Sequence, residues 1–119
     1  MNIIIAGCGK VGYVLAQQLN DENHNITIID TSAERLQPAL SAMDIQGIVG
    51  NATSFLTMQE AGIESANLFI AVTSDDEINL LSCLIAKKSG NCQTIARVRN
   101  PEYFKEISYL KQCMGIEMV

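Results

Sequence analysis

The sequence predicts an α/β protein with a doubly wound, six-stranded parallel sheet and helices on both faces. Short apolar runs rich in Ile and Val alternate with segments of helical periodicity, which is the pattern of repeated β–α–β units. Most of these runs do not alternate with polar residues, as expected of strands buried on both faces. Right-handed crossovers then favour the doubly wound order. We expect strands at residues 2–6, 26–30, 45–49, 68–72, 94–98 and 116–119.

Five further segments place apolar residues near i, i+3, i+4 and i+7, and we expect helices at residues 11–19, 33–43, 55–61, 77–88 and 102–113. The length of 119 residues, 48% of them hydrophobic, suits one domain and leaves no room for a second. Because the chain stops at Val119 inside an apolar run, we expect residues 1–119 to be a domain excised from a longer protein.

The charge balance and the cysteines exclude several classes of function. Lys and Arg number 8 against 13 Asp and Glu, so the net charge of −5 repels nucleic acids and anionic membrane surfaces. The four cysteines form no C-x-x-C pair and His24 is the single histidine, so no metal site is expected. The opening apolar run is short and lacks a basic leader, which favours a cytosolic protein without membrane insertion.

The strongest motif is a glycine-rich loop, G-x-G-x-x-G, directly after the first expected strand and before the first expected helix. In such loops the first glycine permits a tight turn, the second leaves space for a pyrophosphate, and the third lets helix and strand pack closely. The N–H groups of the first helical turn then face the phosphates. The motif predicts a Rossmann-type dinucleotide site, and its residues are Gly7, Cys8, Gly9, Lys10, Val11 and Gly12.

An acidic residue at the end of the second strand supports the same site. Asp30 lies 21 residues beyond the second glycine, where a carboxylate accepts a hydrogen bond from a ribose 2′-OH. Its charge opposes a 2′-phosphate, and Thr31 follows where an NADP site would often place Arg, so NAD(H) is favoured over NADP(H). Arg35 either weakens that preference or pairs with solvent or a neighbouring acid. The alternative is that the glycines only form a turn and Asp30 only caps the next one.

Several segments together resemble the cytosolic, nucleotide-binding regulatory domains of Trk and Ktr potassium-uptake systems, known as RCK or KTN domains. Residues 1–12, 27–31 and 48–53 are similar to family segments, and the resemblance runs almost from end to end. The most specific matches are A-V-T-S-D-D-E-I-N at residues 71–79 and I-A-R-V-R-N-P-E-Y at residues 95–103. The further C-terminal domain of the family has no counterpart in this sequence.

This resemblance implies a regulatory subunit that binds NAD(H), or ADP or ATP, and gates a membrane potassium-transporting subunit. It implies a location at the inner face of the cell membrane through that partner, and assembly into dimers or rings. Within the site, it implies that Lys10 reaches the phosphates and that Asn51, Ala52 and Thr53 line the adenine pocket. An exposed lysine at a helix start and ordinary turn residues are the respective alternatives.

Other candidate residues lie near the same edge of the expected sheet. Thr73 ends the fourth strand beside the ligand crevice, and Ser74 and Glu77 have capping-box spacing, which explains the acidic residues there better than a metal site does. Arg97 and Arg99 lie two apart on the fifth strand and neutralise a nucleotide, a neighbouring subunit's acids or an acid of the same domain. Cys8 lies among amide N–H groups that lower a thiol pKa, although a small space-filling residue is the preferred interpretation.

No catalytic residue is expected. Hydride transfer needs an acid or base beside the nicotinamide, and His24 falls in an expected loop before the second strand. The alternative function is the cofactor-binding half of a truncated NAD-dependent oxidoreductase. The helix at residues 77–88 is apolar around much of its circumference, which predicts a two-fold homodimer through this region unless the helix at residues 102–113 covers it.

Overall fold

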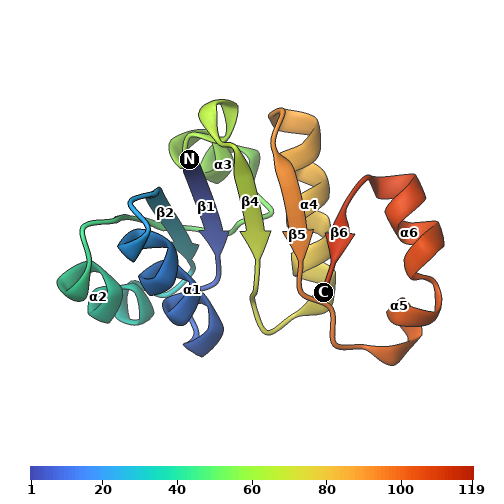
Figure 1. The fold of residues 1–119 in the computed structure, drawn as a ribbon, viewed down its shortest axis with the longest axis horizontal. Helices are drawn as coiled ribbons and strands as arrows, with labels where there is room; N and C mark the ends of the chain where they lie inside the picture. The colour runs from blue at the N-terminus through green and yellow to red at the C-terminus, as the bar shows by residue number, and fades with distance from the viewer.

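The computed structural model describes residues 1–119, apart from the side chains of Phe104 and Ile107. One six-stranded sheet runs through it in the order β3-β2-β1-β4-β5-β6, and every neighbouring pair of strands is parallel (Figure 1). The predicted doubly wound topology is therefore confirmed. The strands are β1 Asn2–Ala6, β2 Asn25–Asp30, β3 Gln46–Val49, β4 Leu68–Ala71, β5 Gln93–Ala96 and β6 Glu117–Met118.

Seven helical segments connect the strands. They are α1 Lys10–Asp21, α2 Ala33–Ala42, α3 Phe55–Glu60, the 3-10 turn η1 Ile63–Ser65, α4 Asp76–Ser89, α5 Pro101–Lys105 and α6 Ile107–Met114. The starts of α2, α3 and α4 are capped by the side chains of Ser32, Ser54 and Asp75, each of which accepts the N–H of the residue three positions on.

Two expectations about the C-terminal third were wrong. The single helix expected at residues 102–113 is two helices, because the N–H of Glu106 bonds to Tyr103 in a tight i to i+3 turn that interrupts the regular ladder. Strand β5 ends at Ala96 rather than at residue 98, because its neighbour β4 ends at Ala71 and offers no further partner beyond the bond from the Arg97 N–H to that residue. Arg97 and Arg99 therefore follow the strand.

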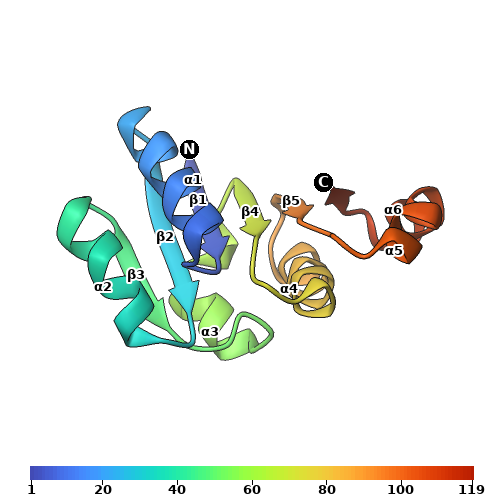
Figure 2. The ribbon, with the colours of Figure 1, turned by 90° about the horizontal axis from the view of Figure 1, so that it is seen from below.

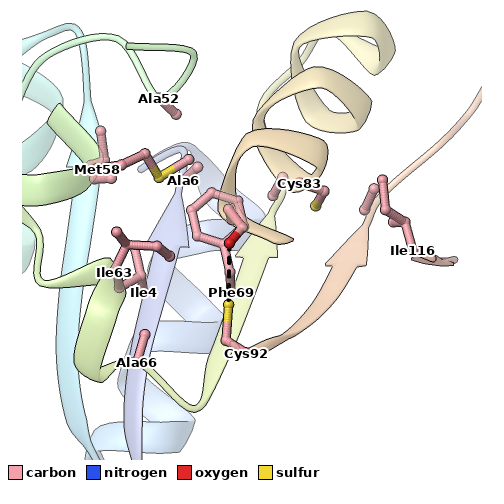
Figure 3. Packing of buried hydrophobic residues seen from close by; sticks show 14 of the residues in the cluster. Ile4, Ala6, Ala52, Met58, Ile63, Ala66, Phe69, Cys83, Cys92 and Ile116 are labelled. Atoms are coloured by element: carbon pink, nitrogen blue, oxygen red, sulfur yellow. Dashed lines mark hydrogen bonds between the residues drawn. The ribbon is translucent and has the colours of Figure 1, made fainter. Parts of the chain in front are cut away.

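Alternate residues of the central strands supply the two layers of the core. Ile3 and Ile5 face the cluster that includes Ala16 of α1 and Leu36 of α2. Ile4 and Ala6 face the opposite cluster, which is covered by α3, η1 and α4 (Figure 2). Phe69 is fully buried in this second cluster, to which Met58, Ile63 and Cys92 also belong (Figure 3). The strands are thus buried on both faces, as their composition indicates.

The helices α5 and α6 lie beyond the β6 edge of the sheet in both ribbon views (Figures 1 and 2). Helix α4 buries Leu80, Cys83 and Ala86 against the sheet, whereas Leu81 is 47% exposed. Contact between the two regions includes a hydrogen bond of 2.8 Å from the Tyr103 hydroxyl to Glu77 Oε1 at the start of α4. No helix of the described residues is long and apolar enough to cross a membrane.

Candidate functional site

A pocket of about 280 Å³ opens where the strand order reverses between β1 and β4. The carboxyl ends of β1, β2 and β4 reach the same edge of the sheet there (Figure 1), which is the usual ligand position in open parallel sheets. The loops that follow these strands and β3 form the walls. The lining residues are Gly7, Gly9, Ile29, Asp30, Thr31, Arg35, Gly50, Asn51, Ala52, Val72, Thr73, Ser74, Asp75 and Ile78.

Two glycines of the loop after β1 are required by the fold itself. Gly7 has φ of +107°, a conformation that other residues rarely adopt, and a Cβ there would lie 3.0 Å from the Thr73 nitrogen. A Cβ on Gly12 would lie 1.8 Å from the carbonyl oxygen of Gly7, so α1 and the loop touch through bare backbone. Both positions therefore need glycine whether or not a ligand binds.

Gly9 differs from both of its neighbouring glycines. Its backbone is extended, with φ of −80° and ψ of −161°, which any residue can adopt. A Cβ added at Gly9 would meet no atom within 4 Å, and the residue lines the pocket at the N-terminus of α1. Nothing in the chain's own packing requires a glycine there, and the open space lies beside the N–H groups of the first helical turn, which favour an anion.

Asp30 joins the loops after β1 and β2 through a carboxylate whose side chain is only 6% exposed. Its Oδ2 accepts the N–H of Cys8 at 2.8 Å, and its Oδ1 accepts the N–H of Ser32 at 2.8 Å. A carboxylate oxygen has two lone-pair positions, so Oδ2 retains capacity for one further donor. The interpretation of Asp30 as a simple turn cap accounts for only one of these bonds.

Arg35 reaches from α2 to the same carboxylate. Its Nη2 lies 2.9 Å and its Nε 3.1 Å from Asp30 Oδ1, and its side chain is 57% exposed. Nη2 also lies 3.5 Å from the Thr31 hydroxyl. Of the partners considered from the sequence, the neighbouring acid is the one observed, and that acid is Asp30 itself.

Cys8 has no lowered thiol pKa, in line with the preferred interpretation of this residue as a small space-filling one. Burial raises the pKa of the Cys8 thiol, the Asp30 carboxylate raises it further, and Arg35 opposes this only in part. The amide N–H of Cys8 itself donates to the Asp30 carboxylate and not to the sulfur. The thiol is therefore protonated at neutral pH.

On the opposite wall, Thr73 is held by Asn79 of α4, a residue with no exposed surface. Asn79 Oδ1 accepts the N–H of Thr73 at 2.9 Å and its hydroxyl at 2.6 Å, while Nδ2 donates to the carbonyl oxygens of Thr73 at 3.1 Å and Arg97 at 2.8 Å. No role for Asn79 was predicted from the sequence. An amide among the apolar residues of this helix was the available signal.

The capping-box prediction for the start of α4 was wrong. Asp75 is the N-cap, and the N–H of Ile78 that it accepts is the main cause of a lowered pKa of this exposed carboxyl. The helix begins one residue later than Ser74 would require, and the Ser74 carbonyl instead accepts a bond from Arg99 Nη2 at 3.1 Å. Asp76 accepts the N–H groups of Arg99 and Asn100, which joins α4 to the segment after β5.

The pocket brings together seven of the thirteen candidate residues, which are Gly7, Gly9, Asp30, Thr31, Asn51, Ala52 and Thr73. Cys8 and Gly12 are buried behind the loop, Lys10 and Val11 are exposed on α1, and the Thr53 hydroxyl and N–H both donate to Asn51 Oδ1. Arg97 contributes its carbonyl to Asn79 rather than its side chain to the pocket lining. The lining residues that the sequence analysis did not assign to the site are Ile29, Arg35, Gly50, Val72, Ser74, Asp75 and Ile78.

The one histidine of the chain lies away from this pocket. His24 Nδ1 lies 3.0 Å from the N-terminal nitrogen of Met1, before β2 begins and thus at the other end of that strand. Across the described side chains, no three His, Cys, Asp or Glu residues are arranged to hold a metal ion.

Comparison with known proteins identifies the family. The TrkA-N domain family matches residues 3–119. The chain is 48% identical over 103 residues to the Trk system potassium uptake protein TrkA homolog of Archaeoglobus fulgidus, and the match covers 87% of this chain but only 23% of that relative.

Solved structures that share the fold include the following two. The TrkA-N domain of the inner membrane protein ybaL from Escherichia coli has a TM-score of 0.85 at 22% identity, with 99% of this chain and 85% of that one covered. The GsuK channel bound to NAD has a TM-score of 0.81 at 19% identity, with 99% and 21% covered. The extent of the family match and the identity to the Archaeoglobus relative together show that this chain belongs to the TrkA-N domain family.

Proposed function

We propose that the pocket binds an adenine nucleotide, NAD(H) foremost, with ADP or ATP using the same adenosine and phosphate contacts. Gly9 carries this proposal. Its glycine is not needed for backbone conformation or packing, yet it leaves open space at the N-terminus of a helix where phosphate groups bind. The open space at Gly9 therefore suits a bound ligand with phosphate groups.

The other walls suit the rest of such a ligand. The free lone-pair position on Asp30 Oδ2 can accept a ribose hydroxyl, and Asn51 with Ala52 lines the part of the pocket next to it, where the adenine would lie. Structures of the GsuK channel with NAD and with ADP support the choice of ligand class, because that protein shares the fold.

We further propose that the domain regulates a membrane potassium-transporting subunit. The support is membership of the TrkA-N family and the potassium-uptake name of the Archaeoglobus relative, of which the chain spans about a quarter. The domain would act in the cytoplasm at the inner face of the membrane through that partner, as a dimer or a ring. The exposed apolar Leu81 on α4 is consistent with a contact between copies.

A sensing role fits the site better than the cofactor half of an oxidoreductase does. Hydride transfer would need an acid or base beside the bound nicotinamide, and the one histidine of the chain contacts the N-terminus instead. The two acids that line the pocket are Asp30, which is engaged by backbone N–H groups, and Asp75, which caps α4.

The proposal is tested by Gly9→Val. The Cβ of the valine would meet no protein atom within 4 Å and its side chain would take up space for phosphate, so we expect NAD(H) and ADP affinity to fall about a hundredfold while the fold is retained. Isothermal titration calorimetry measures binding, and the thermal unfolding midpoint reports on the fold.

The matched control is Gln17→Val, which adds the same side chain to an exposed position of α1 away from the pocket. It should leave nucleotide affinity unchanged. Unaltered nucleotide affinity in Gly9→Val would show that phosphate does not lie at this loop.

A further inference from the structure

Asp30 is fixed in place without help from Arg35. Its two oxygens each accept a backbone N–H, from Cys8 and from Ser32, at 2.8 Å, and these donors belong to the loops that the strands β1 and β2 hold rigidly. The carboxylate would therefore keep its position and its hydrogen bonds if the guanidinium moved away.

Arg35, in contrast, is held loosely. Both of its contacting nitrogens, Nε and Nη2, bond to the same oxygen, Asp30 Oδ1. The pair therefore lacks the two parallel bonds, one to each carboxylate oxygen, that make an arginine–carboxylate pair strong. More than half of the side chain is exposed, and exposed ion pairs contribute little to stability. The guanidinium can thus leave the carboxylate at small cost.

Arg35 lies where its guanidinium could reach a phosphate on the ribose 2′ position. Among the described residues that line the pocket, Arg35 is the only basic one, and it lies beside the carboxylate that would meet the ribose 2′ position. An isolated Asp30 would repel a 2′-phosphate. The pair carries no net charge, and the guanidinium supplies planar donors that suit a phosphate group.

We propose that Arg35 is a specificity-determining residue that makes the pocket tolerant of a 2′-phosphate, so that NADP(H) binds in addition to NAD(H). In the phosphorylated complex the guanidinium turns from Asp30 Oδ1 to the 2′-phosphate, while Asp30 stays bonded to the two N–H groups. The inference rests on the proposed function, since it concerns the same pocket and deepens its ligand assignment.

The experiment measures the dissociation constants of NAD+ and NADP+, which differ only in the 2′-phosphate, by calorimetry for the purified chain and for Arg35→Gln. We expect the unmodified chain to favour NAD+ by less than about tenfold, because the ion pair carries no net charge that would repel the phosphate. In Arg35→Gln, NADP+ affinity should fall at least about tenfold more than NAD+ affinity does, and Arg35→Lys should restore part of the NADP+ affinity. Lys88→Gln, at the far end of α4, removes the same charge away from the pocket and should alter neither affinity.

Three results would overturn the inference. They are a strong preference of the unmodified chain for NAD+, an unchanged preference in Arg35→Gln, and an equal loss of both ligands in Arg35→Gln, which would mean that Arg35 contacts the part common to them. Failure of the unmodified chain to bind either NAD+ or ADP would instead refute the proposed function, and the inference with it.

Discussion

Two strand-to-helix loops meet at the pocket, and each is held by one buried polar side chain. Asp30 holds the loop after β1 with a charged carboxylate that accepts from Cys8, Ser32 and Arg35. Asn79 holds the loop after β4 with a neutral amide that both accepts and donates. Both side chains fix a loop through hydrogen bonds to its backbone, but one is a charged acceptor and the other is a neutral donor and acceptor.

The difference follows from what each loop offers. The N–H groups near Asp30 need only an acceptor, and a carboxylate provides one on each oxygen. At Asn79 the groups to be satisfied are an N–H, a hydroxyl and two carbonyl oxygens, so a donor is also required, and no charge is left on this wall from that residue. Exchanging the two chemistries would therefore separate the contribution of charge from that of shape.

The largest effect is expected for Asn79→Asp. The new carboxylate would be fully buried, would lose the donor to Thr73 and Arg97, and would keep only the neutral N–H and hydroxyl donors of Thr73, so we expect a loss of about 3–5 kcal/mol in the free energy of unfolding near neutral pH. Burial would raise the pKa of the new group in the folded state above its unfolded value. Stability is then lost as the pH rises through the folded pKa and is regained at lower pH.

Urea unfolding at about pH 5 and about pH 8 checks this prediction, with the unmodified chain as the reference at each pH. The deficit of Asn79→Asp should be smaller at the lower pH. An equal deficit at both would mean that lost hydrogen bonds, not the buried charge, explain the effect.

The reverse exchange, Asp30→Asn, should lower the free energy of unfolding less than Asn79→Asp does. It should also weaken NAD(H) binding. An amide oxygen can still accept one of the two N–H groups, but the amide nitrogen would face the other, and the ion pair to Arg35 would be lost, for a cost of about 2 kcal/mol. NAD(H) affinity should fall about tenfold because a carboxylate accepts the ribose hydroxyl more strongly than an amide does.

Denaturant unfolding and calorimetric titration measure these two quantities. Asp44→Asn, an exposed acid away from the nucleotide pocket, is the control for loss of one negative charge. If Asp30→Asn bound NAD(H) as tightly as the unmodified chain, Asp30 would act on loop structure alone.

The two regions also differ in how much of them the sequence could predict. Gly9 and Asp30 belong to a local motif with fixed spacing, so their shared edge of the sheet followed from the strand pattern. Asn79 and Arg97 are eighteen positions apart and meet only because α4 packs beside β5. No local pattern encodes that contact.

The direction of a side chain was the second feature that the sequence could not predict. The sequence placed Arg35 on a helix near Asp30, but whether it paired with this acid or with solvent depended on a rotamer. Helical periodicity likewise continued through Glu106, where the chain in fact turns tightly between α5 and α6. Such breaks depend on individual backbone bonds that periodicity does not detect.

The smallest expected effect concerns an unpartnered hydroxyl of β5, the strand beside α4. Thr94 of β5 is 2% exposed, and its Oγ1 is the one buried side-chain oxygen or nitrogen without a hydrogen-bond partner among the described residues. Thr94→Val removes this hydroxyl, keeps the branched shape and suits a strand, so we expect the free energy of unfolding to rise by about 0.5 kcal/mol. The matched variant Ser82→Ala removes a buried hydroxyl in α4 that does donate, to the Asn79 carbonyl at 3.1 Å, and it should be less stable than Thr94→Val. Urea unfolding of both variants decides the point, because a destabilised Thr94→Val would mean that the hydroxyl has a hydrogen-bond partner after all.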